Sequence, residues 1–316
     1  MTKIVFWSQW ASTPQNGLAD ALPNDEIIRI RDENDLSPAA HAEVAFCGTS
    51  SDRMKRLIAA ARDLRWFHTP SAGVDRFLDV PEFREGKIIL TNNSGSYDIQ
   101  IAEHVMAFIF AAAKRLPWYR DQQHRAAWED QEHHELRGET VVVYGAGSIG
   151  GEVVRLASAL GMRVVALRRS GGPVPGATRV ATPDALAEVA READYLVVAA
   201  PLTPSTRGAV SREVIARLKP SAWVINIARG PIIDEEALID ALAAERIGGA
   251  ALDTFAKEPL PPDSPLWKLP NVMITPHTSN SSPNVRARTL ALFVENVRRY
   301  KAGEPLLNVV NIAAGY

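Results

Sequence analysis

The chain has 316 residues, 46% of them hydrophobic, and a formal net charge of −2. A single hydrophobic core usually stops growing below this length, so we expect two domains, and the near-neutral charge argues against a nucleic-acid or membrane-surface partner. Cys47 is the only cysteine, which excludes an internal disulfide and a cysteine-based metal site, so we expect no metal.

The first hundred residues alternate short apolar runs with a helical pattern. They begin without a basic region followed by a long apolar stretch, so we expect no signal peptide and a cytoplasmic protein. The alternation predicts a parallel sheet covered by helices. The strands are expected at Lys3–Trp7, Ile27–Ile30, Glu43–Cys47, Leu64–His68 and Ile88–Thr91, and a helix at Asp52–Arg62.

A long amphipathic helix is predicted next. It begins at Asp98, a residue type that favours helix N-caps, and ends at about Leu116, just before a proline. The polar stretch that follows is interpreted as an excursion between this helix and the next sheet. Its His133 and His134 lack the spacing of metal ligands and are interpreted as surface residues.

From Thr140 the alternation restarts with stronger contrast. Six buried strands separated by helices predict a complete doubly wound dinucleotide-binding unit. The strands are expected at Val141–Tyr144, Arg163–Leu167, Tyr195–Ala199, Trp223–Ile227, Ala250–Asp253 and Val272–Thr275, with helices at Ile149–Leu160, Asp184–Arg191, Arg212–Leu218 and Glu235–Ala244. A last helix, about Asn284–Lys301, is expected to return the chain to the first domain.

The whole pattern predicts an α/β fold with two doubly wound parallel-sheet domains. A Rossmann dinucleotide-binding domain, residues 98–284, is inserted in a flavodoxin-like substrate-binding domain formed by residues 1–97 and 285–316. Loops of the first domain at 7–10 and 49–51 are expected to face the substrate, but they do not indicate a pocket size.

The segment VVVYGAGSIGG places Gly145, Gly147 and Gly150 in a G-x-G-x-x-G pattern between a strand and a helix. We expect Gly145 to permit the tight turn, Gly147 to let a pyrophosphate approach the backbone, and Gly150 to let the helix pack closely on the strand. The first helical turn, with Ser148 and Ile149, presents N–H groups and the positive end of the helix dipole to the phosphates. A plain tight turn is the alternative, but the strand–loop–helix context favours a dinucleotide site.

The end of the next strand bears on the choice of cofactor. NAD-binding units usually place an acidic residue here, which accepts hydrogen bonds from the adenosine ribose. This chain has Arg168, Arg169 and Ser170 and no acid. Two guanidinium groups and a hydroxyl suit a 2′-phosphate, so the sequence favours NADP(H) over NAD(H). Solvated arginines at a strand end are the alternative interpretation.

Three charged residues follow the late strands of the nucleotide unit, at the sheet edge where ligands of open α/β sheets bind. Arg229 can bind a carboxylate with its planar fork and polarise a neighbouring carbonyl. His277 can donate a proton to the carbonyl oxygen as hydride arrives at the carbon, and Glu258 can orient the imidazole. Each residue alone has an ordinary surface or turn role as its alternative, but the three together predict a site for a 2-oxo acid.

Over nearly its whole length the chain resembles the D-isomer-specific 2-hydroxyacid dehydrogenase family. The matching segments are SAGVD (Ser71–Asp75), NNSG (Asn92–Gly95), AEHVMAF (Ala102–Phe108), GAGSIG (Gly145–Gly150), PLTPST (Pro201–Thr206), INIARGPIIDEEAL (Ile225–Leu238), LDTFAKEPLP (Leu252–Pro261) and TPH (Thr275–His277). The resemblance implies an NAD(P)-dependent oxidoreductase that reduces a 2-oxo acid to a D-2-hydroxy acid, with Arg229, Glu258 and His277 as its catalytic set.

The resemblance also implies binding residues and an assembly. Those expected to line the cofactor are Pro201, Ala228 and Asp253, and those whose backbone N–H groups are expected to hold the substrate carboxylate are Ala72, Gly73 and Val74. Glu103 and His104 match a family position, but we interpret them as helix packing or domain contacts. Family members are typically homodimers built through the nucleotide domain, so a homodimer is expected.

Three alternatives stay open on the sequence. The first is a narrower glyoxylate or hydroxypyruvate reductase, and the second a reductase of branched or aromatic 2-oxo acids. The third is a non-catalytic redox sensor like the corepressors that share this fold, since a sensor can retain the catalytic residues. The residues after the histidine, from Thr278 to Ser281, replace the Ala or Gly of many members, which leaves the shape of the nicotinamide pocket open.

Overall fold

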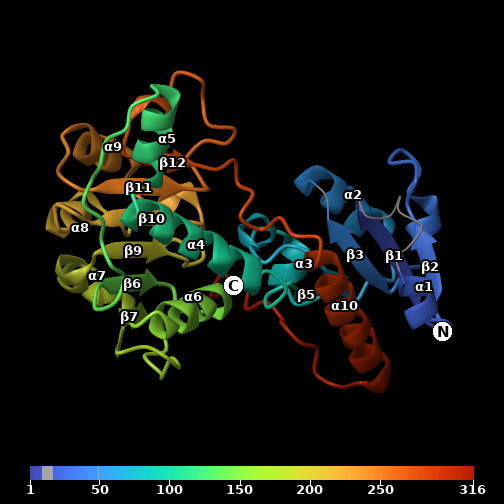
Figure 1. The fold of residues 1–316 in the computed structure, drawn as a ribbon. Helices are drawn as coiled ribbons and strands as arrows, with labels where there is room; N and C mark the ends of the chain where they lie inside the picture. The colour runs from blue at the N-terminus through green and yellow to red at the C-terminus, as the bar shows by residue number, and fades with distance from the viewer. Residues whose placement is uncertain (9–16, 49) are drawn as a thin grey trace. The chain divides into compact units, whose positions relative to one another are not determined.

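The computed structural model describes residues 1–8, 17–48 and 50–316. The chain divides into two compact units, unit 1 (Met1–Tyr97 and Ser282–Tyr316) and unit 2 (Asp98–Ser281). Each unit is built on one parallel sheet with helices packed against it, so the predicted α/β class is confirmed (Figure 1). Of the loops expected to face the substrate, residues 9, 10 and 49 lie outside the described residues.

The sheet of unit 1 has five parallel strands in the order β2-β1-β3-β4-β5, which is the flavodoxin-like order. The elements of unit 1 are β1 (Lys3–Ser8), α1 (Leu18–Ala21), β2 (Glu26–Arg29), β3 (Val44–Gly48), α2 (Ser51–Ala60), β4 (Trp66–His68), α3 (Pro81–Arg84), β5 (Ile89–Thr91) and α10 (Val285–Ala302). The sequence does not predict α1 and α3, because helices of 4 residues are too short to show a helical period.

The carboxyl-terminal helix α10 belongs to unit 1 because its apolar stripe completes the core of that unit. Phe293 is fully buried, and its ring centroid lies 5.0 Å from that of Phe46 on β3 and 5.3 Å from that of Trp66 on β4. Val297, one helical turn further on, is also fully buried in the same cluster. Buried aromatic side chains contribute about 1.5–3 kcal/mol each, which is enough to hold the chain end on the first sheet.

The sheet of unit 2 has seven parallel strands in the order β12-β11-β10-β9-β6-β7-β8. Its strands are β6 (Thr140–Tyr144), β7 (Arg163–Leu167), β8 (Arg179–Ala181), β9 (Tyr195–Val198), β10 (Trp223–Asn226), β11 (Gly249–Leu252) and β12 (Val272–Ile274). The expected number of six strands is wrong, since β8 adds a seventh at the edge of the sheet. It was not predicted because it has 3 residues and none of them is fully buried, so it forms no apolar run.

Each predicted helix of unit 2 is present, although one is shorter than expected and a further helix lies partly in the stretch interpreted as an excursion. They are α4 (Asp98–Ala113), α5 (Leu116–His124), α6 (Ser148–Ala159), α7 (Leu186–Val189), α8 (Arg212–Arg217) and α9 (Glu235–Ala243). The long helix ends at Ala113 and not near Leu116 as predicted, because Arg115 adopts a left-handed conformation with φ 50°. The next helix, α5, then begins at Leu116 with Pro117 in its first turn. None of the described helices is long and apolar enough to cross a membrane.

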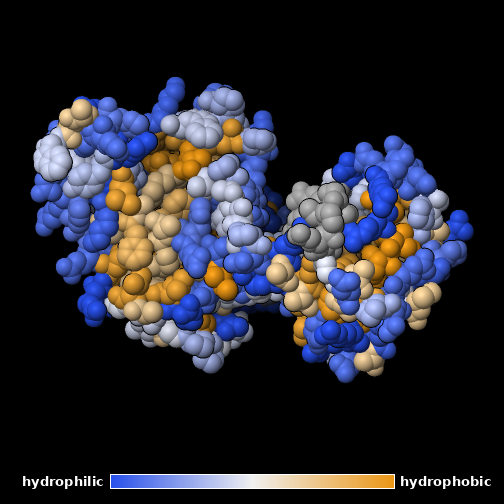
Figure 2. All heavy atoms as spheres, turned by 45° about the vertical axis from the view of Figure 1, so that its right-hand side comes forward, coloured by the Kyte–Doolittle hydropathy of each residue, from blue (hydrophilic) through white to orange (hydrophobic). Residues whose placement is uncertain are grey.

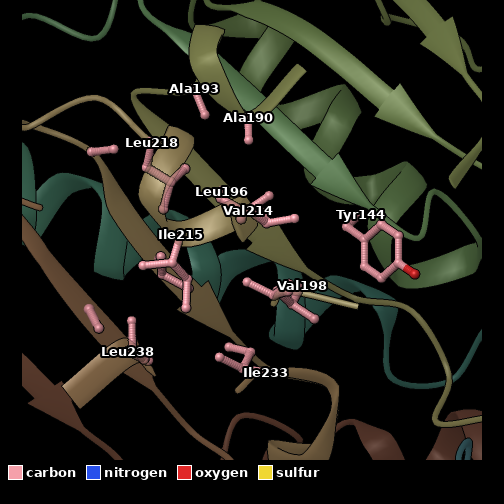
Figure 3. Packing of buried hydrophobic residues seen from close by; sticks show 14 of the residues in the cluster. Tyr144, Ala190, Ala193, Leu196, Val198, Val214, Ile215, Leu218, Ile233 and Leu238 are labelled. Carbon is pink, nitrogen blue, oxygen red and sulfur yellow. The ribbon is translucent and has the colours of Figure 1, made fainter. Parts of the chain in front are cut away.

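The largest core cluster of unit 2 lies between its sheet and α7, α8 and α9. Figure 3 shows Leu196 and Val198 of β9 beside Val214 and Ile215 of α8, and all four side chains are buried. On the other side, α4 packs closely against α6, the helix that follows the glycine-rich loop. The sheet is therefore covered by helices on both faces, as a doubly wound fold requires.

Candidate active site

The three predicted catalytic residues follow three adjacent strands. In the sheet, β10 pairs with β11 and β11 with β12, all in parallel. Arg229 follows β10, Glu258 follows β11 and His277 follows β12. Because the carboxyl ends of parallel neighbours meet at one edge, the three loops leave the sheet side by side.

Glu258 and His277 form the central contact of the site. The Nδ1 atom of His277 lies 2.8 Å from Oε2 of Glu258, and the two side chains are 37% and 36% exposed. The other oxygen, Oε1, accepts a hydrogen bond of 3.0 Å from the backbone N–H of Phe255. A carboxylate can only accept, so Nδ1 of His277 carries the hydrogen, and in the neutral imidazole Nε2 bears the lone pair.

Asp253 holds the turn that carries His277. The backbone N–H of His277 donates to the Asp253 carbonyl at 2.9 Å, and those of Thr278 and Ser279 donate to its carboxylate at 2.8 and 3.1 Å. His277 itself has a φ of 50°, a left-handed conformation that costs a non-glycine residue energy. The bonds to Asp253 compensate for that cost.

The environment of Asp253 keeps it ionised. The residue is fully buried, and burial raises the pKa of its carboxyl group. Hydrogen bonds from Ser279, Thr275 and Thr278 act in the opposite direction, and together they leave the pKa below its usual value. Of the Thr-Ser pair that departs from the small residues of many relatives, Ser279 adds a side-chain donor to this carboxylate, whereas Thr278 contributes only its backbone N–H.

Arg229 is tied to the loop of Glu258 through its neighbour Gly230. A Cβ atom on Gly230 would lie 1.9 Å from the carbonyl carbon of Phe255, so only glycine allows the two loops to touch. The Arg229 guanidinium donates from Nη1 to the carbonyl of Ala228 at 2.7 Å, and its own carbonyl accepts from Asn226 Nδ2 at 3.1 Å. The loops after β10 and β11 are therefore in direct backbone contact.

The glycine-rich loop lies where the strand order reverses, between β6 and β9. Gly145 has φ 102°, and a Cβ on it would lie 2.3 Å from the backbone nitrogen of Ala200, after β9. A Cβ on Gly150 would lie 2.2 Å from the Gly145 carbonyl oxygen, so α6 packs directly on the loop. A Cβ on Gly147 would meet nothing within 4 Å. The open space is therefore at Gly147, where a pyrophosphate would approach the backbone.

The first turn of α6 has the features of a phosphate site. Gly147 is its N-cap, and no side chain caps the helix. Gly147 and Ser148 are exposed and Ile149 is half-buried, so the first N–H groups of the helix are accessible. The Ser148 hydroxyl donates to the carboxylate of Asp98 at the start of α4. These residues fit the diphosphate of a dinucleotide.

The arginine pair stands directly after β7, next to the glycine-rich loop. Backbone N–H groups of Gly145 and Ala146 both donate to the carbonyl of Leu167, the last residue of β7. Arg168 is half-buried and donates from Nη1 to the Pro173 carbonyl at 3.2 Å, whereas Arg169 and Ser170 are exposed. The remaining residues expected to line the cofactor also follow strands of this sheet: Pro201 is exposed, and Ala228 is buried.

The residues expected to hold the substrate carboxylate lie in unit 1, on the loop after β4. The side-chain amide of Asn92 donates to the Ala72 carbonyl at 3.0 Å, and Tyr97 donates its hydroxyl hydrogen to the Pro70 carbonyl at 2.5 Å. Among the described residues, no protein acceptor is found for the backbone N–H groups of Ala72, Gly73 and Val74. Asn92 and Tyr97 therefore fix this loop, in which Ala72 and Gly73 are half-buried and Val74 is buried.

Several residues of the site were not singled out from the sequence. Thr275, Ser279 and Asn92 each support a predicted site residue through a hydrogen bond. Asn92 and Thr275 belong to the segments that carry the family resemblance, which is a usable signal. Ser279 lies in the segment where the chain departs from that resemblance. Among the described residues, no group of three His, Cys, Asp or Glu side chains could hold a metal ion.

The sheet order, the glycine-rich loop and the uncapped helix define a Rossmann dinucleotide-binding protein with a second, flavodoxin-like unit. Residues 106–279, more than half of the chain, match the family described as "D-isomer specific 2-hydroxyacid dehydrogenase, NAD binding domain". The chain belongs to this family of NAD(P)-dependent oxidoreductases.

Two curated relatives and one solved structure illustrate the similarity. D-3-phosphoglycerate dehydrogenase of Methanocaldococcus jannaschii is 34% identical over 93% of this chain, which spans 55% of that protein's length. Glyoxylate reductase of Korarchaeum cryptofilum is 33% identical over 80% of this chain and 77% of its own length. The solved structure is that of the NADPH-dependent glyoxylate/hydroxypyruvate reductase of Sinorhizobium meliloti in complex with NADP and sulfate. Its sequence is 28% identical, and the superposition covers 100% of both chains with a TM-score of 0.87.

Proposed function

We propose that this chain reduces a 2-oxo acid to the D-2-hydroxy acid, with Arg229, Glu258 and His277 as its catalytic residues. The observation that carries the proposal is the 2.8 Å contact between His277 Nδ1 and Glu258, at the sheet edge where this fold binds ligands. In this pairing the carboxylate orients the imidazole and stabilises its protonated form, while Nε2 exchanges the proton.

Each residue has a definite part in the proposed reaction. A reduced nicotinamide, when bound, supplies the hydride that the 2-carbon accepts. The imidazolium of His277 donates the proton that the 2-oxygen needs, and removes it in the reverse direction. The Arg229 guanidinium binds the carboxylate and polarises the adjacent carbonyl. Unit 1 is the proposed substrate-binding domain, with N–H groups of Ala72, Gly73 and Val74 as further carboxylate donors.

The proposed cofactor is NADP(H). The position after β7 carries Arg168, Arg169 and Ser170 and no carboxylate that would repel a 2′-phosphate. The exposed Arg169 and Ser170 suit a charged ligand at the molecular surface. The Gly145, Gly147 and Gly150 loop, with Ser148 and Ile149, holds the diphosphate, and Pro201, Ala228 and Asp253 line the rest of the cofactor.

Among substrates we favour glyoxylate and hydroxypyruvate. Two relatives that resemble this chain over most of its length carry the names glyoxylate reductase and glyoxylate/hydroxypyruvate reductase. The proposed preference for NADP(H) fits an enzyme that reduces its substrate. The second of these relatives is named an NADPH-dependent reductase. Branched and aromatic 2-oxo acids belong in the same assay as competitors.

The test is oxidation of NADPH and NADH with glyoxylate, hydroxypyruvate, pyruvate, 2-oxoisocaproate and phenylpyruvate. We expect turnover with one class of acid, and a loss of kcat of about 10²- to 10⁴-fold in His277→Ala. Glu258→Gln keeps an acceptor oxygen but loses the charge, so its loss is expected to be smaller, about tenfold. Cofactor binding without turnover on any acid would overturn the proposal in favour of a redox sensor.

The cofactor preference has its own variants. Replacing both Arg168 and Arg169 by Ala is expected to raise the KM for NADPH about 10- to 100-fold and to leave that for NADH nearly unchanged, because only NADPH carries the 2′-phosphate. Arg246→Ala, an exposed arginine in the turn before β11, is the matched control and should change neither. Equal effects on both cofactors would contradict the assignment.

A further inference from the structure

His104 on α4 is linked to the turn of His277 by two consecutive hydrogen bonds within unit 2. Its Nε2 atom lies 3.2 Å from Oγ1 of Thr275, and that hydroxyl lies 2.6 Å from Oδ1 of Asp253. Asp253 in turn accepts the backbone N–H groups that hold the turn of His277. A helix far away in the sequence therefore contacts the catalytic turn through polar atoms.

The direction of these bonds follows from their chemistry. The Asp253 carboxylate can only accept, so the single hydroxyl hydrogen of Thr275 points to Asp253. The Thr275 oxygen must then accept from His104, which places a hydrogen on Nε2 of that imidazole. The chain of donors runs from His104 through Thr275 to Asp253, and in a neutral imidazole it requires the tautomer with the hydrogen on Nε2.

We propose that His104 is a positioning residue for the reaction, whose Nε2–H fixes the Thr275 hydroxyl on Asp253 and through it the turn that carries His277. The inference rests on the proposed function, since it assigns His104 an effect on the proton-transfer step. It replaces the expectation that His104 serves only in packing. The arrangement fixes the hydroxyl of Thr275, which in turn adds a donor to the Asp253 carboxylate.

The surroundings of His104 keep it in the required form. The residue is half-buried, with its ring edge-on to that of Phe108 at 4.5 Å. Burial lowers the pKa of His104, while the charge of Asp253 acts weakly in the opposite direction, so the imidazole is neutral at pH 7. Packing against Phe108 alone would be satisfied by any ring, whereas the contact with Thr275 requires a donor nitrogen.

The kinetic test compares a donor with a non-donor at each end of the link. His104→Gln keeps an N–H donor near the position of Nε2, and Thr275→Ser keeps the hydroxyl. We expect both to stay within about twofold of wild type in kcat, whereas His104→Phe and Thr275→Val each lose about tenfold, the value of one good hydrogen bond. All variants should retain the wild-type thermal midpoint within a few degrees, which excludes simple unfolding.

The double variant separates positioning from packing. Because both substitutions break the same link, His104→Phe combined with Thr275→Val should lose no more than about twofold beyond either single variant. Multiplied losses of about a hundredfold, or a His104→Gln variant as slow as His104→Phe, would overturn the inference. His104→Phe keeps the ring contact with Phe108, so packing is matched across the comparison.

A second measurement does not depend on turnover. Nitrogen-15 correlation spectra of the seven histidines report which ring nitrogen carries the hydrogen, and the His104 signals are those that vanish in His104→Gln. We expect the Nε2–H form in the wild type and a mixture of tautomers in Thr275→Val. Wild-type protein without activity would refute the proposed function but leave this result intact, whereas a dominant Nδ1–H form would refute the link itself.

Discussion

The completely buried imidazole of His68 places a titratable group in the core of unit 1. Its Nδ1 lies 2.8 Å from Oγ1 of Thr91, which also accepts from Trp66 Nε1 at 2.8 Å. Its Nε2 has no hydrogen-bond partner among the described residues. The rings of Phe46 and Phe293 lie within 5.4 and 5.3 Å. A protonated His68 would thus hold its charge among aromatic side chains.

This burial predicts a specific loss of stability in acid. Burial lowers the pKa of His68 from 6.5 to about 3. The unfolded chain therefore binds a proton between these values while the folded chain does not, so the free energy of unfolding falls as the pH falls through this window. The expected slope from this group is about 1.4 kcal/mol per pH unit.

Urea unfolding of wild type and His68→Phe measures that slope. The Phe variant has no titrating group at this position, so its stability should fall less steeply between about pH 6.5 and about pH 4. Both proteins share every other titrating group, and the difference between the two curves isolates His68. Parallel curves would show that the imidazole is not held neutral by the core.

At the scale of elements, the loop between β6 and α6 combines two kinds of glycine. Gly150 is required by packing, because a Cβ would lie 2.2 Å from a backbone oxygen, whereas a Cβ on Gly147 would meet nothing in the protein. An alanine should therefore lower the stability of the fold at Gly150 and the affinity for the cofactor at Gly147. Packing excludes a side chain at Gly150, and we expect the bound cofactor to exclude one at Gly147.

We expect Gly150→Ala to lower the stability of unit 2 by about 2–4 kcal/mol, since the helix must move away from the strand. Gly147→Ala should keep the wild-type stability and weaken NADPH binding at least tenfold, because its methyl group occupies the space of the pyrophosphate. Thermal unfolding and cofactor fluorescence distinguish the two. A stable Gly150→Ala protein, or a Gly147→Ala protein with normal affinity, would contradict this division.

The elements that sequence patterns identified and those that they missed differ in length and burial. Long apolar runs such as Val141–Tyr144 are buried on both faces of a parallel sheet, and such runs are visible without any structure. Strand β8 and the break at Arg115 were missed, because a three-residue edge strand and a single left-handed residue leave almost no pattern. Their conformations depend on the sheet and helices around them.

At the scale of the whole molecule, the homodimer that the family resemblance implies, built through unit 2, stays a prediction. Figure 2 shows a broad hydrophobic area on this unit, bordered by hydrophilic residues. Large apolar side chains are exposed on α4, α5 and the segment after them: Ile99 (47%), Phe110 (40%), Leu116 (54%) and Trp128 (103%). Exposed large apolar side chains on neighbouring segments are typical of an interface.

Light scattering after size exclusion is expected to give twice the mass of one 34.5 kDa chain. Replacing both Phe110 and Trp128 by Glu should shift the protein to a monomer, because each charge would lose its water in the interface. Ile89→Glu, an exposed apolar residue on β5 of unit 1, is the matched control and should remain a dimer. A monomeric wild type would refute the assembly.

The sequence by itself predicted which residues form the candidate site but not how they are held. The glycine pattern and the charged residues after strands are local features, because a strand end and its loop are set by neighbouring residues. Strand order then brings Arg229, Glu258 and His277 to one edge, as the parallel fold predicts. The family resemblance supplied the D configuration, which no local pattern carries.

Only the tertiary structure decided the supporting contacts. The carboxylate of Asp253 collects donors from Thr275, Thr278 and Ser279, and His104 reaches the same group from α4. These contacts join residues up to 171 positions apart, so they depend on how closely helix, strand and loop pack. A side chain finds such partners only after the backbone is in place, and no spacing along the chain records them.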